Sequence, residues 1–171
     1  MLEKICSPLI EFDYTGHLNL SLVMEMEKKN SRFVYVWSKD NHIDTIEDED
    51  KLHLVIKAKS TQEIVGYIII GGMKSKDKSL ELERIVVDKK GKGYGREAIK
   101  LIKKLCFDIL SYHRLWLDVF DDNEAAIKLY FNEGFVKEGL LRECKKYPEG
   151  YRSMLIMSIL EHEYYNQNNQ E

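Results

Sequence analysis

The sequence predicts a single α/β domain, with a mixed β-sheet flanked by helices, and three observations support this fold class. Short runs rich in β-branched and aromatic residues alternate with amphipathic stretches of helical periodicity. Polar or glycine-containing segments separate them, with no linker and no internal repeat. The length of 171 residues suits one domain with a sizeable core. We therefore expect one domain over 1–171, with its core at 52–160.

The N-terminal half of the chain is expected to lead from helix to sheet. Apolar residues at Leu18, Leu22, Val23 and Met26 have helical spacing and predict a helix over 18–29. A short apolar and aromatic segment follows at 34–37, and the acidic stretch at 44–50 suits a solvated helix face or a loop. The next elements are strands at 52–58, 64–70 and 80–87, with a polar turn at 59–63 and a charged loop at 74–79.

The C-terminal half continues as helix, strand and helix, followed by two closing strands. Ala98, Ile102, Leu105 and Ile109 form one apolar stripe, which predicts an amphipathic helix over 96–110. The remaining elements are a strand at 115–120, a helix at 123–132, and two antiparallel strands at 135–142 and 154–160 around a polar loop. We expect the tail at 161–171 to be frayed.

Composition excludes several classes of protein. With 26 Lys and Arg against 29 Asp and Glu, the net charge of −3 argues against a nucleic-acid partner. No apolar run approaches the roughly 20 residues that span a bilayer, and the first residues lack a signal-peptide core. The three widely spaced cysteines, Cys6, Cys106 and Cys144, indicate reduced thiols in a cytoplasmic protein. We expect no metal and no membrane partner.

A basic glycine loop is the strongest functional signal. The apolar run Ile85-Val86-Val87 ends at Asp88, and Gly91, Gly93 and Gly95 follow among lysines, just before a helix. Glycine lets backbone N–H groups turn toward an anion, and a helix N-terminus adds partial positive charge. The arrangement predicts a ligand that carries phosphates.

Three kinds of phosphate loop compete for this stretch. The triphosphate P-loop motif is absent. Residues 93–98 satisfy the dinucleotide fingerprint G-x-G-x-x-A, with Asp118 about 20 residues further on, although Asp118 lies inside an apolar run. The third pattern is [QR]-x-x-G-x-[GA], which residues 90–95 match if Lys90 replaces the first residue.

A second motif decides among the three. Residues 123–135 read N-x-x-A-x-x-L-Y-x-x-x-G-F, directly after the strand predicted at 115–120. In this order the two motifs resemble the core of the GNAT N-acetyltransferases, in the branch that acetylates protein N-termini, polyamines and other small amines. The resemblance implies the acyl-CoA N-acyltransferase fold, a mostly antiparallel sheet in which the parallel strands at 80–87 and 115–120 splay around acetyl-CoA. The turn before Gly91 is shorter than is usual in the family.

The resemblance also implies the site residues. A primary amine would attack the thioester directly, with Tyr130 as the acid that protonates the CoA sulfur and a backbone N–H near Val87 as oxyanion donor. Glu83 is the first choice of base and Glu81 the second. The cofactor-binding residues would be Ile85, Val86, Val87, Lys90, Gly91, Lys92, Gly93, Tyr94, Gly95, Arg96, Asn123, Lys128 and Tyr130.

Each of these roles has a structural alternative. Tyr130 could only pack under the sheet, Asn123 could be a helix N-cap, and Glu81 and Glu83 could be solvated acids. The acceptor is an unidentified amine, and the chain is a candidate homodimer. A CoA-binding domain without catalysis and a dinucleotide-dependent oxidoreductase are the other two functions that stay open.

Overall fold

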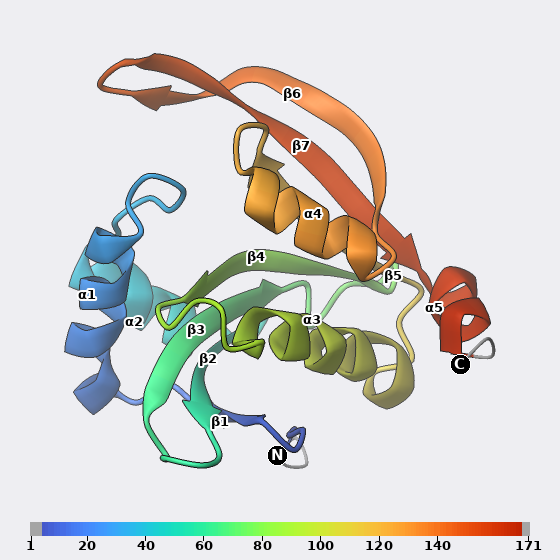
Figure 1. Ribbon diagram of the computed structural model, residues 1–171, viewed down its shortest axis with the longest axis horizontal. Helices are drawn as coiled ribbons and strands as arrows, with labels where there is room; N and C mark the ends of the chain where they lie inside the picture. Colours follow the sequence, from blue (N-terminus) through green and yellow to red (C-terminus); the bar gives the residue numbers. More distant parts are fainter. Residues whose placement is uncertain (1–4, 169–171) are drawn as a thin grey trace.

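The computed structural model describes residues 5–168, which form a seven-stranded sheet with helices on both faces (Figure 1). The strands lie in the order β1-β2-β3-β4-β5-β7-β6. They are β1 Ile10–Tyr14, β2 Lys51–Ala58, β3 Ile64–Gly71, β4 Ser79–Val87, β5 Arg114–Phe120, β6 Val136–Tyr147 and β7 Gly150–Leu160. Neighbours are antiparallel except for the parallel pair β4 and β5, so the predicted mixed sheet is confirmed.

Two apolar layers cover the faces of the sheet. The larger layer packs the helices at 94–104 and 124–132 against one face and includes Ile99, Ile102 and Tyr130. The smaller layer packs Val23 and Met26, from the helix at 20–29, against the other face. The helical segments are η1 His17–Asn19, α1 Leu20–Lys29, α2 Lys39–Glu47, α3 Tyr94–Lys104, η2 Leu105–Ile109, α4 Glu124–Asn132 and α5 Glu161–Asn168. No helix within residues 5–168 is long and apolar enough to cross a membrane.

Two N-terminal elements differ from the expectation. Strand β1 was missed because it is only five residues long, yet Ile10 and Phe12 are buried where it pairs with β2. Residues 44–47 of the acidic stretch lie in α2, as the helix alternative predicted, but this helix begins earlier than the stretch, after Ser38. That serine accepts a hydrogen bond from the Asn41 amide at 3.2 Å, and Asn41 reaches back to the Ser38 amide. This reciprocal capping box fixes the start of α2.

The predicted helix at 96–110 is also modified. Residues 105–109 form the π-helix η2, in which each turn holds more residues than an α-turn. The wider turn changes the rotation of the side chains, so Ile109 is 40% exposed although it was placed on the apolar stripe.

The last two strands form a longer hairpin than predicted. Only residues 148 and 149 separate β6 from β7, so the polar segment expected as a loop is paired strand. Tertiary contacts at the tip stabilise it. The Tyr147 ring lies 4.9 Å from that of Tyr35, and the Tyr35 hydroxyl donates to the Lys146 carbonyl at 2.8 Å.

The expected frayed tail is helical through Asn168, and residues 169–171 lie outside the described part. The expectation was wrong for 161–168 because α5 has partners in η2. Tyr164 stacks on Phe107 at 4.9 Å between ring centroids, and its hydroxyl bonds Asp108 at 3.0 Å.

Strand β4 contains a β-bulge that decides which side chains face which layer. Ile69 of β3 pairs with Arg84, whereas Ile70 pairs with Leu82, so Glu83 is an extra residue. Leu82 faces the α3–α4 layer, and after the bulge Val86 faces the α1 layer. The extra residue therefore reverses the alternation of faces along β4.

Candidate active site

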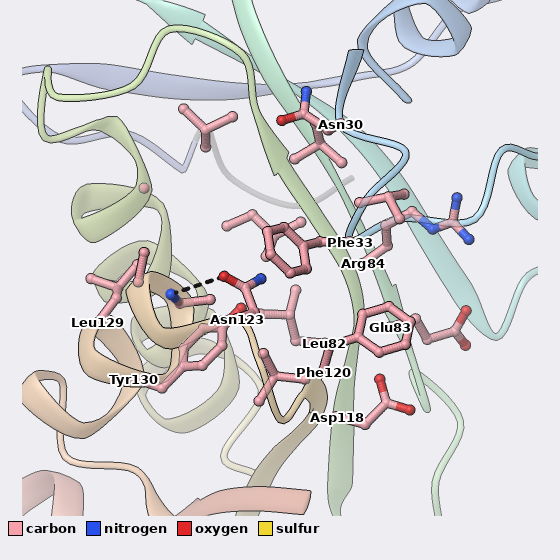
Figure 2. Close-up of a pocket in the computed structure, with 18 of the residues that line it drawn as sticks. Asn30, Phe33, Leu82, Glu83, Arg84, Asp118, Phe120, Asn123, Leu129 and Tyr130 are labelled. Carbon is pink, nitrogen blue, oxygen red and sulfur yellow. Dashed lines mark hydrogen bonds between the residues drawn. The ribbon is translucent and has the colours of Figure 1, made fainter. Parts of the chain in front are cut away.

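A cavity opens where β4 and β5 separate. The two strands pair from Ser79 with Arg114 to Leu82 with Leu117, and the ladder then ends. The cavity has a volume of about 880 Å³ and is lined by β4, β5, the glycine loop, α3 and α4, with the segment after α1 on another side. Figure 2 shows Asn123 and Tyr130 on the α4 side and Glu83 and Asp118 on the side of the strands. Because β4 and β5 separate here, side chains from both faces of the sheet line the cavity.

The glycine loop forms one end of this cavity. Gly91 and Gly93 have φ angles of 74° and 80°, and Gly93 is the N-cap of α3. This left-handed backbone favours glycine, and no atom lies within 4 Å of where a Cβ of Gly91 would be. Open backbone at a helix N-terminus suits the pyrophosphate of CoA, so the residues present fit that group.

Most of the predicted cofactor residues line the cavity. The residues that do so are Ile85, Val86, Val87, Lys90, Gly91, Gly93, Tyr94, Gly95, Arg96, Asn123 and Tyr130. Lys92 and Lys128 are exposed and lie outside this lining. Arg96 also pairs with Glu133, its Nε being 2.7 Å from Oε1. Lys89, which lines the cavity as well, is bound to Glu63 at 2.5 Å.

Asn123 and Tyr130 are held by α4. The Asn123 side chain accepts from the Ala126 amide at 3.3 Å, so this residue is the N-cap of α4 and also lines the cavity. Tyr130 is only 5% exposed, and its hydroxyl makes no hydrogen bond within residues 5–168. Burial, and then the charge of Asp118, raise the pKa of this phenol, which keeps its proton at neutral pH.

Three carboxylates, Glu81, Glu83 and Asp118, form the other end of the cavity, here called the carboxylate end. Glu83 is neutralised by Lys51, whose Nζ lies 2.8 Å from Oε2. Burial raises the pKa of Glu81 to about 7, and the charges of Glu83 and Asp118 act in the same direction. A carboxyl with this pKa can take and release a proton near neutral pH.

The wall beside the carboxylate end depends on residues that the sequence did not single out. Glu27 is fully buried and accepts from the Tyr67 hydroxyl at 2.5 Å, the Trp37 amide at 2.9 Å and the Arg84 guanidinium. The Arg84 guanidinium lies 3.9 Å from the centroid of the Trp37 ring. Burial acts to raise the pKa of Glu27, but these donors and the nearby His42 ring keep it below its ordinary value. These contacts of Glu27 with Arg84 and Trp37 hold the segment after α1 against β4.

Asp118 has a different place from the one that the dinucleotide fingerprint suggested. It is a half-buried member of the carboxylate end rather than an acid at the end of its strand. The signal in the sequence was its position: Leu115, Leu117 and Val119 occupy every second position of the strand, so Asp118 belongs to the other face of β5.

The comparisons with known proteins agree with this geometry. The model of the acetyltransferase (GNAT) family matches residues 22–135. A spermidine N(1)-acetyltransferase from Vibrio cholerae serotype O1 is 29% identical over 122 residues, which are 71% of this chain and 70% of the relative.

Solved structures show the same fold. A crystal structure of the spermidine N-acetyltransferase from Vibrio cholerae with CoA and spermine has a TM-score of 0.83 at 21% identity and covers 94% of this chain and 100% of that one. A dodecameric structure of the same enzyme in an intermediate state has a TM-score of 0.79 at 22% identity, covering 94% and 99%. The family match overturns the oxidoreductase alternative, because it spans the glycine loop and the N-x-x-A-x-x-L-Y motif together. The chain belongs to the acetyltransferase (GNAT) family.

Proposed function

We propose that this acetyl-CoA-dependent N-acetyltransferase acts on a primary ammonium group of a small polyamine. One observation carries the proposal: Glu81, with its pKa near 7, and the protonated Tyr130 line one cavity, on opposite faces of the split sheet. The carboxylate end holds three acids against Lys51 and Lys145, which favours a cationic acceptor. The spermidine acetyltransferases found by the comparisons support this class of amine.

Glu81 is a better base than Glu83, which was preferred from the sequence. The carboxylate of Glu83 is occupied by the Lys51 ammonium, whereas Glu81 makes no hydrogen bond or ion pair within residues 5–168. A primary amine with a pKa near 10 arrives protonated and must lose a proton before it can attack. Glu81 is free to accept that proton, directly or through water.

Acetyl-CoA supplies an acetyl group activated as a thioester. After Glu81 removes the first proton, the amine nitrogen forms a bond to the carbonyl carbon and the C–S bond breaks, leaving the electron pair on sulfur. Tyr130 donates its O–H proton to that sulfur. The second proton of the nitrogen returns through solvent to the tyrosinate, and Glu81 releases the first proton to solvent, so protons balance over the turnover.

An acceptor screen tests the proposal. The enzyme is incubated with acetyl-CoA and, in turn, spermidine, spermine, a linear diamine, a monoamine and a peptide with a free N-terminus. Thiol release and product mass are then measured. We expect the polyamines to give the largest kcat/KM. A preference for the peptide or the monoamine contradicts the acceptor class, and thiol release without an acetylated product contradicts amine transfer altogether.

We also propose that the chain assembles into homodimers or larger oligomers in the cytoplasm. β6 is an edge strand of the sheet, and Val136, Leu140 and Leu141 on it are 45–51% exposed. The described cysteines are free thiols, as expected in a reducing compartment. Light scattering on the eluting protein tests the oligomeric state, and a monomer across micromolar concentrations contradicts it.

A further inference from the structure

Asp118 lies at the edge of the splayed strands and makes no hydrogen bond or ion pair within residues 5–168, although the charge of Lys145 acts on it. In the β4–β5 ladder Glu81 stands opposite Trp116, so Asp118, two residues further along β5, is on the same face as Glu81. It lies one residue beyond the last pair, Leu82 with Leu117, where the strands have begun to separate. Its carboxylate therefore borders the gap rather than the paired part of the sheet.

The lack of partners distinguishes Asp118 and Glu81 from the other acids near the cavity. Glu83 is bound to Lys51, and Glu27 is bound to Arg84. Neither Asp118 nor Glu81 makes a hydrogen bond or an ion pair within residues 5–168, although both are half-buried. Leaving two carboxylates partly desolvated and unpaired is unfavourable unless a cation joins them.

A separate observation points to a ligand between these acids and α4. Tyr130 is only 5% exposed and lines the same cavity. Its hydroxyl has no hydrogen-bond partner in the described chain. The pKa of Tyr130 responds to the charge of Asp118, and so does that of Glu81. The charge of Asp118 therefore acts on both the base and the acid.

We propose that Asp118 binds the acceptor nitrogen together with Glu81, the two carboxylates holding one primary ammonium group at the gap between β4 and β5. This rests on the proposed amine transfer. Glu81 takes the proton, and Asp118 supplies the counter-charge that holds the nitrogen in place. Burial raises the pKa of Asp118, and the charge of Lys145 opposes this shift. The other charged groups facing this pair are Glu83 on β4, Lys51 on β2 and Lys145 on β6, with the Tyr130 phenol on α4.

Asp118→Asn tests the proposal, since it removes the charge and keeps the shape. We expect KM for spermidine to rise on the order of tenfold, as for the loss of one charge-assisted contact, with KM for acetyl-CoA unchanged. Removing the like charge also lowers the pKa of Glu81, so the acidic limb of the kcat/KM profile moves to lower pH. Asp121→Asn is the matched control, because this exposed aspartate follows β5 outside the cavity and should change neither quantity.

Asp118→Glu retains the charge and provides a second arm. It should keep the acidic limb near its wild-type position while KM changes, because the longer side chain displaces the carboxylate. If wild-type enzyme acetylates the amine and Asp118→Asn has wild-type KM and pH profile, the role of Asp118 is wrong while amine transfer stands. If Asp118→Asn fails to fold, an unchanged KM for spermidine in Asp118→Glu overturns the two-carboxylate site. If no amine is acetylated by the wild type, the proposed function fails first.

Discussion

Replacing Tyr130 by Phe separates catalysis from packing, because the hydroxyl has no hydrogen-bond partner in the described chain. The ring is 5% exposed and packs near Phe135, at 5.7 Å between centroids, and Tyr130→Phe preserves that contact. No folded-state hydrogen bond is lost, so the free energy of unfolding should change by less than about 0.5 kcal/mol. The melting temperature should then move by at most about 2 °C for a chain of this size.

Turnover, in contrast to stability, should fall strongly in Tyr130→Phe. Loss of a general acid lowers kcat by roughly 10²–10⁴-fold. This factor corresponds to about 3–5 kcal/mol of transition-state free energy. The assay is single-turnover thiol release at saturating acetyl-CoA. The loss should be smaller with an acetyl thioester of a more acidic thiol, because that leaving group needs less protonation.

Tyr112 provides a matched control, since it is also 5% exposed but its hydroxyl donates to the Met73 carbonyl at 2.7 Å. Tyr112→Phe should lower the free energy of unfolding by about 0.5–1.5 kcal/mol and leave turnover unchanged. Wild-type turnover in Tyr130→Phe would refute the reasoning and mean that water or a backbone group protonates the sulfur.

Three further predictions follow from the same geometry. The pKa of Glu81 is about 7 in the folded protein, against 4.5 for the ordinary group, so the stability of the wild type falls as pH rises from 4.5 to 7. Glu81→Gln should therefore raise the melting temperature more at pH 8 than at pH 5, and an equal effect at both contradicts the raised pKa. Gly93→Val, at φ 80°, should weaken acetyl-CoA binding measured by calorimetry, whereas Gly150→Val, at φ 134° in the distant hairpin turn, should cost stability without changing affinity. Glu27→Gln breaks a buried ion pair and should lower the free energy of unfolding in urea by about 3–5 kcal/mol, while Glu25→Gln, at an exposed pair with Lys29, should lower it by no more than about 0.5 kcal/mol.

The central elements could be predicted from the sequence because their signals are local. The strands at 64–70 and 80–87 differ from β3 and β4 by one residue at one end, since β-branched runs bounded by polar turns need no tertiary information. The hairpin could not be predicted in the same way. β6 is exposed along most of its length, and its outer part is ordered by contacts of Tyr147 and Lys146 with Tyr35, more than 100 residues away in the chain.

The site was predicted unevenly for a similar reason. The glycine loop and the N-x-x-A-x-x-L-Y motif are contiguous, and their residues line the cavity. Glu83 was preferred to Glu81 because it is nearer the glycine loop in the sequence, which says nothing of the bulge or of Lys51, 32 residues away. Glu27 could not be found at all, because an acid in an amphipathic helix looks solvated until Arg84 and Tyr67 are placed around it.

The bulge at Glu83 makes the number of residues in β4 as important as their identity. Deleting one residue there would restore regular alternation, turning Arg84 away from Glu27 and exchanging the faces of Ile85 and Val86. A substitution in β4 keeps the register of the strand, whereas a single deletion would shift the glycine loop relative to the carboxylates. Variation in this part of the chain should therefore accumulate as changes of side chain and almost never as changes of length.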